Sequence, residues 1–485
     1  MNADRATPLG EGTALDDLVA GPEARHPGQS GFRLVSEGPE ALALRARTAF
    51  LAGRSLDVQT YIWHADTTGT YLAHHILQAA DRGVRVRLLV DDMDARARNA
   101  GFAGLDAHPR IEVRMFNPFE SRKGAVRKAL EVIAKFPRLN RRMHNKTWIA
   151  DNRIAVVGGR NLGDEYFGAS DDVNFFDLDF ALIGPVVRDA SASFDRYWNA
   201  PATSPMRELD PDAVSDDALA RVRHLLETQA EAAERSRYAL EVRKDDAVQR
   251  LVAGDWPLEW TDRWQFLSDD PRKVSNEGPE PEMSPVLAHL FEMAEAAERD
   301  LTVISPYFVP GKGGSHRLAD VVRGGARVRV LTNSLRANDV PAVHGGYSRY
   351  RTRLLKDGVQ LWELKPLLGK GPRMRASISG ASLHTKALTV DGRVLFVGSY
   401  NLDPRSRSLN CEQGVIAESP ALASQLESIF ERQISGTHAW TVTLGPGRRL
   451  EWRDGHAVHH SEPDAPFGRR AQAWLARVLP IEAQL

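Results

Sequence analysis

Two stretches of this sequence repeat one pattern: HNKTWIADNRIAVVGGRN at residues 144–161 and HTKALTVDGRVLFVGSYN at residues 384–401. Both read His-x-Lys-x4-Asp-x6-Gly-x2-Asn. An internal repeat of this length usually reflects a repeated structural unit. The sequence therefore predicts two copies of one unit, each built around this motif.

The similarity continues on both sides of the motif. Three further pairs of segments match in the same order: 56–63 with 301–308, 82–92 with 324–334, and 178–198 with 411–433. Apolar extended segments alternate with helical ones, which is typical of an α/β domain with a mixed sheet. Within each motif, Asn152-Arg153 and Asp391-Gly392 separate two apolar runs and predict a hairpin.

These patterns predict two pseudo-symmetric α/β domains that share one active site at their interface. We expect the chain to divide into a flexible leader, a first domain, a polar helical connector, a second domain, and a tail with a hairpin and an amphipathic helix. The corresponding ranges are 1–30, 31–200, 201–282, 283–440 and 441–485.

Composition narrows the classes of function. The 485 residues are 42% hydrophobic and 26% charged, an ordinary globular balance. Lys plus Arg is 63 and Asp plus Glu is 64, so the net charge of −1 disfavours a strongly basic nucleic-acid binder. The single cysteine, Cys411, excludes an intrachain disulfide or a multi-cysteine metal site. With no apolar run of about 18 residues and no secretory signal pattern, we expect a cytoplasmic protein without transmembrane spans.

Histidine and lysine two positions apart on a strand point to the same face. If the two units come together, one pocket would hold two imidazoles, two ammonium groups and two amides: His144, His384, Lys146, Lys386, Asn161 and Asn401. Lysines and amides suit a phosphate whose negative charge grows during displacement. One imidazole can attack phosphorus while the other protonates the departing alkoxide. This chemistry needs neither a metal nor another cofactor.

The doubled motif resembles that of the phospholipase D superfamily, over nearly all of residues 31–435. The stretches 138–146, 157–168 and 177–187 most resemble bacterial cardiolipin synthases that lack transmembrane spans. The resemblance implies two phospholipase D-like sandwich domains and a phosphatidyl transfer through a phosphohistidine. It also implies His144 as nucleophile and His384 as general acid and then base, although the reverse assignment remains open. The lysines and asparagines of both motifs would hold phosphate oxygens.

The family further implies a carboxylate about thirty residues after each histidine, which orients its ring. Glu412 fits this role for His384, and Asp179, with Asp177 as the alternative, fits it for His144. The motif residues Asp151 and Asp391 are expected beyond the catalytic pair, in structural salt bridges or in a supporting layer. The second copy has the family's Gly-Ser at Gly398-Ser399, whereas the first has Gly158-Gly159, which removes one hydroxyl group.

Residues for lipid binding are less well defined by the pattern. Ser399, Tyr61 and Tyr307 are candidates for contact with the substrate. Residues 122–142 form a basic amphipathic pattern that suits an anionic membrane surface, with a solvated helix or nucleic-acid binding as alternatives. The C-terminal segment with Arg469, Arg470, Trp474 and Leu475 is a second candidate for membrane contact.

Three enzymatic functions share these motifs. The first is synthesis of cardiolipin from phosphatidylglycerol, with phosphatidylethanolamine as a second candidate substrate, at the inner face of the cell membrane. Hydrolysis by a phospholipase D and cleavage of nucleic acid are the others, and a noncatalytic lipid-binding protein is a fourth reading. Nucleic acid is not an expected partner, and the sequence leaves the need for a helper protein open.

Overall fold

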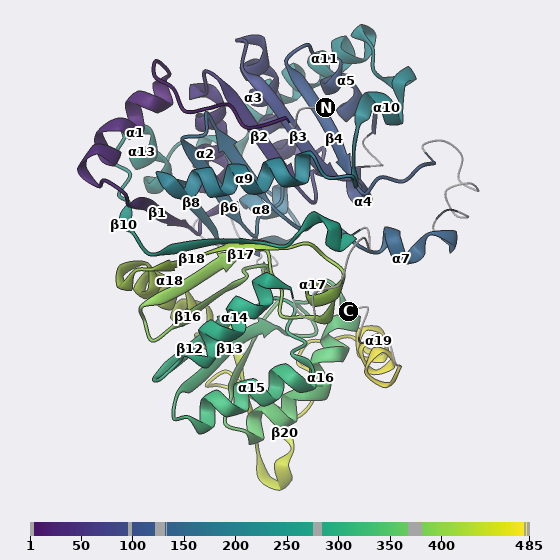
Figure 1. Ribbon diagram of the computed structural model, residues 1–485. Helices are drawn as coiled ribbons and strands as arrows, with labels where there is room; N and C mark the ends of the chain where they lie inside the picture. The colour runs from purple at the N-terminus through teal and green to yellow at the C-terminus, as the bar shows by residue number, and fades with distance from the viewer. Residues whose placement is uncertain are drawn as a thin grey trace. The chain divides into compact units, whose positions relative to one another are not determined.

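The computed structural model describes residues 4–95, 99–121, 131, 133–274, 284–366, 381–479 and 482. Its chain forms two compact units (Figure 1). Unit 1 comprises Met1–Ala169, Asp179–Glu280 and Leu409–Gln413, and unit 2 comprises Ser170–Leu178, Pro281–Ser408 and Gly414–Leu485. Each unit therefore includes one short segment that is flanked in the sequence by residues of the other unit: Leu409–Gln413 in unit 1 and Ser170–Leu178 in unit 2.

Unit 1 is built on a nine-stranded mixed sheet with the order β10-β1-β8-β6-β5-β2-β3-β4-β9. Strands β2, β3 and β4 are parallel, and the other neighbours are antiparallel. In chain order the strands are β1 (Ser30–Val35), β2 (Ser55–Thr60), β3 (Arg85–Asp91), β4 (Ile111–Phe116), β5 (Thr147–Ala150), β6 (Ile154–Gly158), β8 (Asp179–Ile183), β9 (Thr203–Pro205) and β10 (Glu259–Thr261); β11 (Trp264–Ser268) follows.

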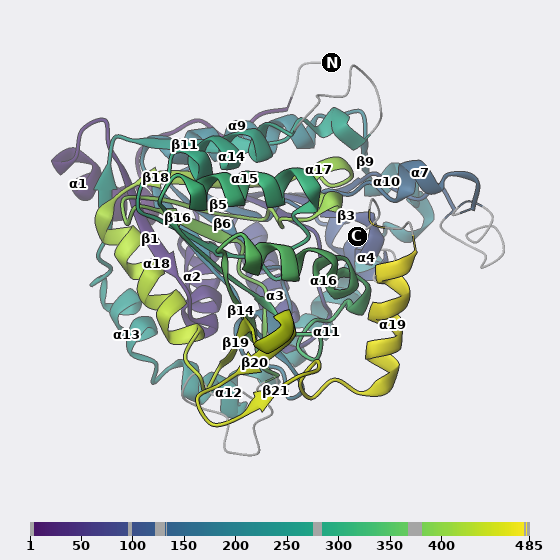
Figure 2. The ribbon, with the colours of Figure 1, turned by 90° about the horizontal axis from the view of Figure 1, so that it is seen from below.

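Helices lie on both faces of this sheet, with α9 on one face and α2 and α3 on the other (Figure 2). The helices of unit 1 are α1 (Ala14–Arg25), α2 (Gly38–Leu51), α3 (Thr67–Asp81), α4 (Asp92–Ala95), α5 (Asn99–Asp106), α7 (Phe136–Leu139), α8 (Asp164–Phe167), α9 (Pro185–Trp198), α10 (Met206–Leu209), α11 (Asp216–Glu234), α12 (Arg237–Val242) and α13 (Asp246–Ala253), with 3₁₀ turns at Pro211–Ala213 and Pro271–Val274.

The main sheet of unit 2 follows the order β18-β17-β16-β12-β13-β14-β19-β20-β21. Its strands are β12 (Asp300–Ile304), β13 (Arg327–Asn333), β14 (Gln360–Leu364), β16 (Ala387–Val390), β17 (Val394–Gly398), β18 (Gln413–Glu418), β19 (Ala439–Leu444), β20 (Leu450–Arg453) and β21 (Val458–His459). A separate parallel pair joins β7 (Asn174–Phe176) to β15 (Ala381–Leu383). The helices are α14 (Pro285–Glu295), α15 (Gly311–Arg323), α16 (Pro341–Lys356), α17 (Pro404–Ser408), α18 (Pro420–Gln433) and α19 (Phe467–Val478), with a 3₁₀ turn at Pro446–Arg448.

The two units repeat one topology, as the sequence predicts. The order β8-β6-β5-β2-β3-β4 in unit 1 matches β18-β17-β16-β12-β13-β14 in unit 2, with three parallel strands at the same place in each. The segments 56–63 and 301–308 contain all but the first residue of β2 and β12. The segments 178–198 and 411–433 contain the equivalent strand and helix pairs. The α/β class with mixed sheets is confirmed.

Each motif forms the predicted antiparallel hairpin, β5–β6 in unit 1 and β16–β17 in unit 2. Asp151 and Asn152 have φ of 52° and 56°, and Asp391 and Gly392 have φ of 53° and 63°. Two consecutive residues with positive φ match the right-handed twist of a hairpin, and Asn, Asp and Gly tolerate that conformation best. The predicted C-terminal hairpin and helix also form, as β19–β20 and α19.

The ends of the predicted domains differ from the two units. Residues 14–25, expected within a flexible leader, form α1, whose Leu15 and Val19 are buried. Asp16 of this helix pairs with Arg54 and Arg153, which holds α1 on unit 1. The expected connector 201–282 belongs mainly to unit 1, where β9 and β10 extend the sheet and α11 packs on α3 and α5. The expected tail 441–485 belongs to unit 2.

Candidate active site

The first motif places its histidine and lysine directly before β5. His144 is 7% exposed and Lys146 is 3% exposed, and Lys146 Nζ donates a hydrogen bond to the backbone oxygen of His144 at 2.6 Å. Burial of a lysine is costly unless its ammonium group has partners. The two side chains are thus held at one end of the hairpin, in surroundings that suit an anionic group.

A carboxylate from the segment before β18 orients His144. Nδ1 of the ring lies 2.9 Å from Oε2 of Glu412, which is fully buried. The backbone N–H of His144 also donates to the oxygen of Cys411 at 2.8 Å, so the two segments lie side by side. Glu412 is itself fixed, because its N–H donates to Asp269 Oδ2 at 3.1 Å. A carboxylate on Nδ1 fixes the tautomer of an imidazole and stabilises its protonated form.

The second motif repeats this arrangement within unit 2. His384 Nδ1 lies 2.5 Å from Asp177 Oδ2, and the N–H of His384 donates to the oxygen of Phe176 at 2.8 Å. Lys386 Nζ bonds the backbone oxygen of His384, as Lys146 does in the first copy. In both units the carboxylate follows the residue whose carbonyl accepts the histidine N–H.

The predicted pairing of carboxylates with histidines is therefore wrong. Glu412 pairs with His144, and Asp177, the weaker of the two alternatives in the first repeat, pairs with His384. Strand register explains the relation between them: Gly158 pairs with Asp179 and Gly398 pairs with Gly414, so Asp177 and Glu412 occupy equivalent positions. An alignment of the two repeats at these strands would have selected Asp177 over Asp179.

Asp179 has a structural role instead. Its carboxylate is fully buried and accepts from Arg45 Nη2 at 3.0 Å and from Arg160 Nη1 at 3.2 Å. Both arginines are buried as well. A buried carboxylate between two arginines neutralises charge inside the fold, so Asp179 joins α2 to the strands β6 and β8 rather than orienting His144.

An aromatic ring lies against each histidine. Tyr61 contacts the His144 ring edge-on at 5.2 Å between centroids, and Lys146 Nζ lies 5.4 Å from the centre of the Tyr61 ring. Phe175 stacks on His384 at 5.2 Å. Tyr61 was a candidate, but Phe175 was missed. The signal for it was its place two residues before Asp177.

The remaining candidates for phosphate or substrate contact are mostly buried or engaged with other side chains. Asn161 is buried and its amide is engaged, because Oδ1 accepts from the N–H of Ile62 and Nδ2 donates to the Tyr166 hydroxyl at 2.9 Å. Asn401 and Ser399 are buried after β17. The Tyr307 hydroxyl contacts both carboxylate oxygens of Asp339 at 2.8 Å.

The motif aspartates lie at the far end of the hairpins from the histidines. Asp151 follows β5 and accepts from the N–H groups of residues 53, 54 and 55, whereas His144 precedes β5. Asp391 accepts equivalently from the N–H groups of residues 298, 299 and 300. A strand rises about 3.3 Å per residue, so these carboxylates are distant from the histidines of their own motifs. Backbone donors take the place of the expected salt bridges.

Cys411 stands next to Glu412 but lacks the character of a nucleophile. Burial raises the pKa of its thiol well above the usual range, and the residue is fully buried. The thiolate is the reactive form of cysteine. Cys411 therefore acts through its backbone, which bonds to Arg142 and His144.

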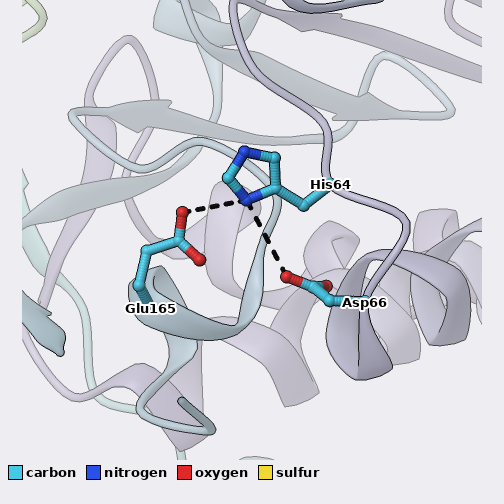
Figure 3. Close-up of side chains that lie close together, drawn as sticks. All are labelled: His64, Asp66 and Glu165. Atoms are coloured by element: carbon cyan, nitrogen blue, oxygen red, sulfur yellow. Dashed lines mark ion pairs between the residues drawn. The ribbon is translucent and has the colours of Figure 1, made fainter. Parts of the chain in front are cut away.

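The side chains of His64, Asp66 and Glu165 lie close together in unit 1 (Figure 3). His64 Nδ1 lies 3.0 Å from Glu165 Oε1 and 3.9 Å from Asp66 Oδ2. Burial, together with repulsion from Asp164 and Glu165, raises the pKa of Asp66. One imidazole and two carboxylates are ligand types that Zn²⁺ accepts. However, Asp66 already accepts from the N–H groups of residues 69 and 164, so the geometry is explained without an ion.

Comparison with known proteins agrees with this arrangement. A family profile described as "Cardiolipin synthase, PLD-like domain" matches residues 49–198 and 290–434, and each range contains one His–Lys pair. The chain belongs to the family of cardiolipin synthases with phospholipase D-like domains.

The alignments with individual relatives cover almost the whole of this chain. Cardiolipin synthase C of Escherichia coli (strain K12) is 41% identical over 468 residues, which cover 95% of this chain and 97% of that protein. An uncharacterised protein of Helicobacter pylori (strain ATCC 700392 / 26695) is 30% identical and covers 96% and 92%. The crystal structure of phosphatidylserine synthase from Haemophilus influenzae Rd KW20 has a TM-score of 0.59 at 12% identity over 95% of this chain and all of that one. The last comparison supports the fold.

Two features of the chain bear on membrane contact: its helices and its basic segment. Within the described ranges, every helix is too short or too polar to cross a bilayer. The basic segment 122–142 lies partly outside the described residues, which omit 122–130 and 132. Of its described arginines, Arg142 is fully buried and pairs with Asp91, so this cation is unavailable to a membrane.

Proposed function

We propose that this chain is a phosphatidyltransferase that makes cardiolipin from two phospholipids, with both His–Lys motifs acting on one phosphate. The observation that carries the proposal is the repeated triad of carboxylate, imidazole and lysine in each unit. A single such set supplies a nucleophile or a general acid, and the reaction needs both. The E. coli relative bears the name of a cardiolipin synthase, which supports the choice of product.

In the first step, Nε2 of His144 attacks the phosphorus of one phosphatidylglycerol. The bond from phosphorus to the headgroup oxygen breaks, and protonated His384 gives its proton to the departing glycerol. Lys146 and Lys386 stabilise the charge on the phosphate oxygens in the transition state. The products of this step are phosphatidyl-His144, free glycerol and neutral His384.

In the second step, a hydroxyl group of another phosphatidylglycerol attacks the same phosphorus. His384 now accepts the hydroxyl proton while the phosphorus–nitrogen bond breaks and frees His144. Two phosphatidylglycerols thus give one cardiolipin and one glycerol. With phosphatidylethanolamine as donor, ethanolamine would leave instead. Glu412 and Asp177 keep each Nδ1 engaged, which reserves Nε2 for phosphorus chemistry.

We also propose that the enzyme works as a peripheral protein on the inner face of the cell membrane, where both lipids are available. A hydrolytic phospholipase D would share the first step and differ in the acceptor, which would be water. Nucleic-acid cleavage is disfavoured by the net charge of −1.

The decisive experiment incubates the purified protein with vesicles of phosphatidylglycerol and phosphatidylethanolamine, followed by mass spectrometry of the lipids. Cardiolipin with release of glycerol or ethanolamine supports the proposal. Phosphatidic acid as the main product would replace it with hydrolysis. Retained activity in a metal chelator is expected, because the imidazoles and lysines supply the acid, the nucleophile and the positive charge.

A further inference from the structure

Helix α19 of unit 2 buries small side chains and exposes its large apolar ones, unlike an ordinary surface helix. Its buried residues are the small Ala473 and Ala476. Its large apolar side chains face solvent: Phe467 is 86% exposed, Trp474 64%, Leu475 50% and Val478 55%. A surface helix of a globular protein normally turns its large apolar residues to the core. Here the arrangement is reversed.

The exposed side chains form one continuous stripe, which we call the α19 stripe. Positions 467, 474, 475 and 478 follow the spacing i, i+7, i+8, i+11 and so share a face. Ala473 and Ala476 lie about half a turn away, at about 100° per residue. Exposed apolar surface gathered in one patch usually marks an interaction site, whereas scattered single residues do not.

The helix is rigidly mounted beneath this stripe. It packs closely on α16, because a Cβ at Gly345 would lie 2.3 Å from the oxygen of Ala473 (Figure 2). Arg349 of α16 donates to the backbone oxygens of Ala476, Arg477 and Leu479 and so satisfies the C-terminal carbonyls. Near the other end, Arg469 donates to the oxygen of Asn338 at 2.7 Å. The stripe is thus presented by a helix that is already ordered, so binding requires no folding.

The charge beside the stripe indicates the partner. The α19 segment contains Arg469, Arg470 and Arg477 and no acidic residue, and Arg470 and Arg477 are exposed. These two arginines are seven residues apart, about two helical turns, and therefore lie on the same flank of the stripe. Aromatic and aliphatic side chains bordered by arginine suit the interface of an anionic bilayer, where tryptophan ring systems and guanidinium groups both reside. A second copy of this chain would bring like charges together.

We infer that α19 is a membrane-docking helix, which inserts Phe467, Trp474, Leu475 and Val478 into the headgroup layer of an anionic phospholipid surface. This inference rests on the proposed function, because an enzyme that uses membrane phospholipids as substrates must reach a membrane surface. The helix lies in the plane of the membrane and does not cross it. Docking through α19 would bring the enzyme to its substrates without placing α19 in the catalytic site.

The test compares the full-length wild type with the double variant Trp474→Ser/Val478→Ser. The control is Leu225→Ser on α11 of unit 1, which removes an apolar side chain that is 50% exposed, close to the 55% of Val478. Flotation with phosphatidylcholine vesicles, with and without phosphatidylglycerol, gives the affinities. We expect the double variant to bind the anionic vesicles at least about tenfold more weakly, since two apolar side chains no longer enter the bilayer. Arg477→Glu should weaken binding to the anionic vesicles alone, and the control should match the wild type.

A fluorescent probe supplies a second measurement if the double variant folds poorly. Trp474→Cys can be labelled selectively, because Cys411 is fully buried. Emission from the label should rise and shift to the blue when anionic vesicles are added. No change at position 474, or unchanged flotation of a folded double variant, would overturn the inference. Loss of a dimer without loss of vesicle binding would also overturn it and assign the stripe to a second copy of the chain.

A water-soluble short-chain phosphatidylglycerol separates this inference from the proposed function. The double variant should retain wild-type transfer on this monomeric substrate while losing activity on vesicles. If the wild type binds vesicles through α19 but transfers no phosphatidyl group on either substrate, the docking role is supported and the proposed function fails.

Discussion

At the scale of single residues, the assignment of carboxylates to histidines has a direct test. Glu412→Gln and Asp177→Asn keep the shape of each partner but remove the charge that orients an imidazole and stabilises its protonated form. We expect kcat to fall by about 10²–10⁴-fold in each, with little change in melting temperature. Steady-state kinetics on phosphatidylglycerol vesicles and thermal unfolding would measure both.

Asp179→Asn is the matched control, because sequence spacing alone favours this residue. Its loss of charge leaves Arg45 and Arg160 buried without full compensation. The free energy of unfolding should fall by about 3–5 kcal/mol, as measured by chemical denaturation. If Asp179→Asn lowered kcat in a stable protein while Asp177→Asn did not, the pairing predicted from the sequence would replace the one that the structure shows.

Asp391 gives a prediction with a pH dependence. Burial raises the pKa of this carboxyl group, but three backbone N–H donors and the Arg299 charge outweigh it, so the pKa is lowered overall. A carboxylate with a lowered pKa in the folded state stabilises the fold above its unfolded pKa, and this stabilisation disappears as the pH falls through the folded pKa. We expect Asp391→Asn to cost about 1–2 kcal/mol at pH 7.

The difference between Asp391→Asn and wild type should shrink steadily below about pH 4, near the ordinary pKa of aspartate. Urea denaturation at several pH values would follow it. A difference that stayed constant down to strongly acid pH would show that the carboxylate charge contributes nothing.

The residue types of the site were predictable from sequence, because His, Lys and Asp recur at fixed spacing. Their partners were not. Glu412 is distant in sequence from His144, and its approach depends on a parallel bridge between Met143 and Cys411 that no local pattern encodes. The aspartates of the motif were expected to form salt bridges, but short loops before β2 and β12 offer three backbone donors in a row.

At the scale of elements, the turn of each hairpin sets the register that places histidine and lysine. Gly392 has φ of 63°, and a Cβ there would meet no heavy atom within 4 Å. Replacement therefore tests backbone strain alone. Gly392→Ala should lower the free energy of unfolding by about 1 kcal/mol.

Gly392→Asn is the control for this turn, since asparagine tolerates positive φ and stands at the equivalent position, Asn152, in the first hairpin. It should lose clearly less stability than Gly392→Ala in the same denaturation experiment. Equal losses in the two variants would contradict the assignment of strain to this turn.

The hairpins of the two motifs and the alternation of strands with helices followed from the sequence because apolar periodicity and turn residues are local signals. The ends of the domains did not. The sequence predicts a flexible leader where helix α1 forms, although Thr13 and Asp16 make a capping box in its first turn. The short strands β9 and β10 are not predictable from the sequence, because three residues give too little pattern to separate a strand from a loop.

At the scale of the whole molecule, the repeated topology suggests how one chain acquires two complementary acid–base groups. Buried arginines show that the likeness extends to packing: Arg87 on β3 pairs with Asp195 of α9, and Arg329 on β13 pairs with Glu427 of α18. Duplication of a unit that holds one oriented imidazole yields two, and a double displacement uses one as nucleophile and the other as acid. Membership of the cardiolipin synthase family agrees with this scheme.

The central claim is that both histidines serve a single reaction. The most direct measurement is the rate of cardiolipin formation from phosphatidylglycerol by His144→Ala and by His384→Ala, each checked for wild-type thermal stability. We predict that each variant alone loses at least about 10³-fold in kcat. Two folded variants that each retained about half of the wild-type rate would contradict the claim, because each unit would then work independently.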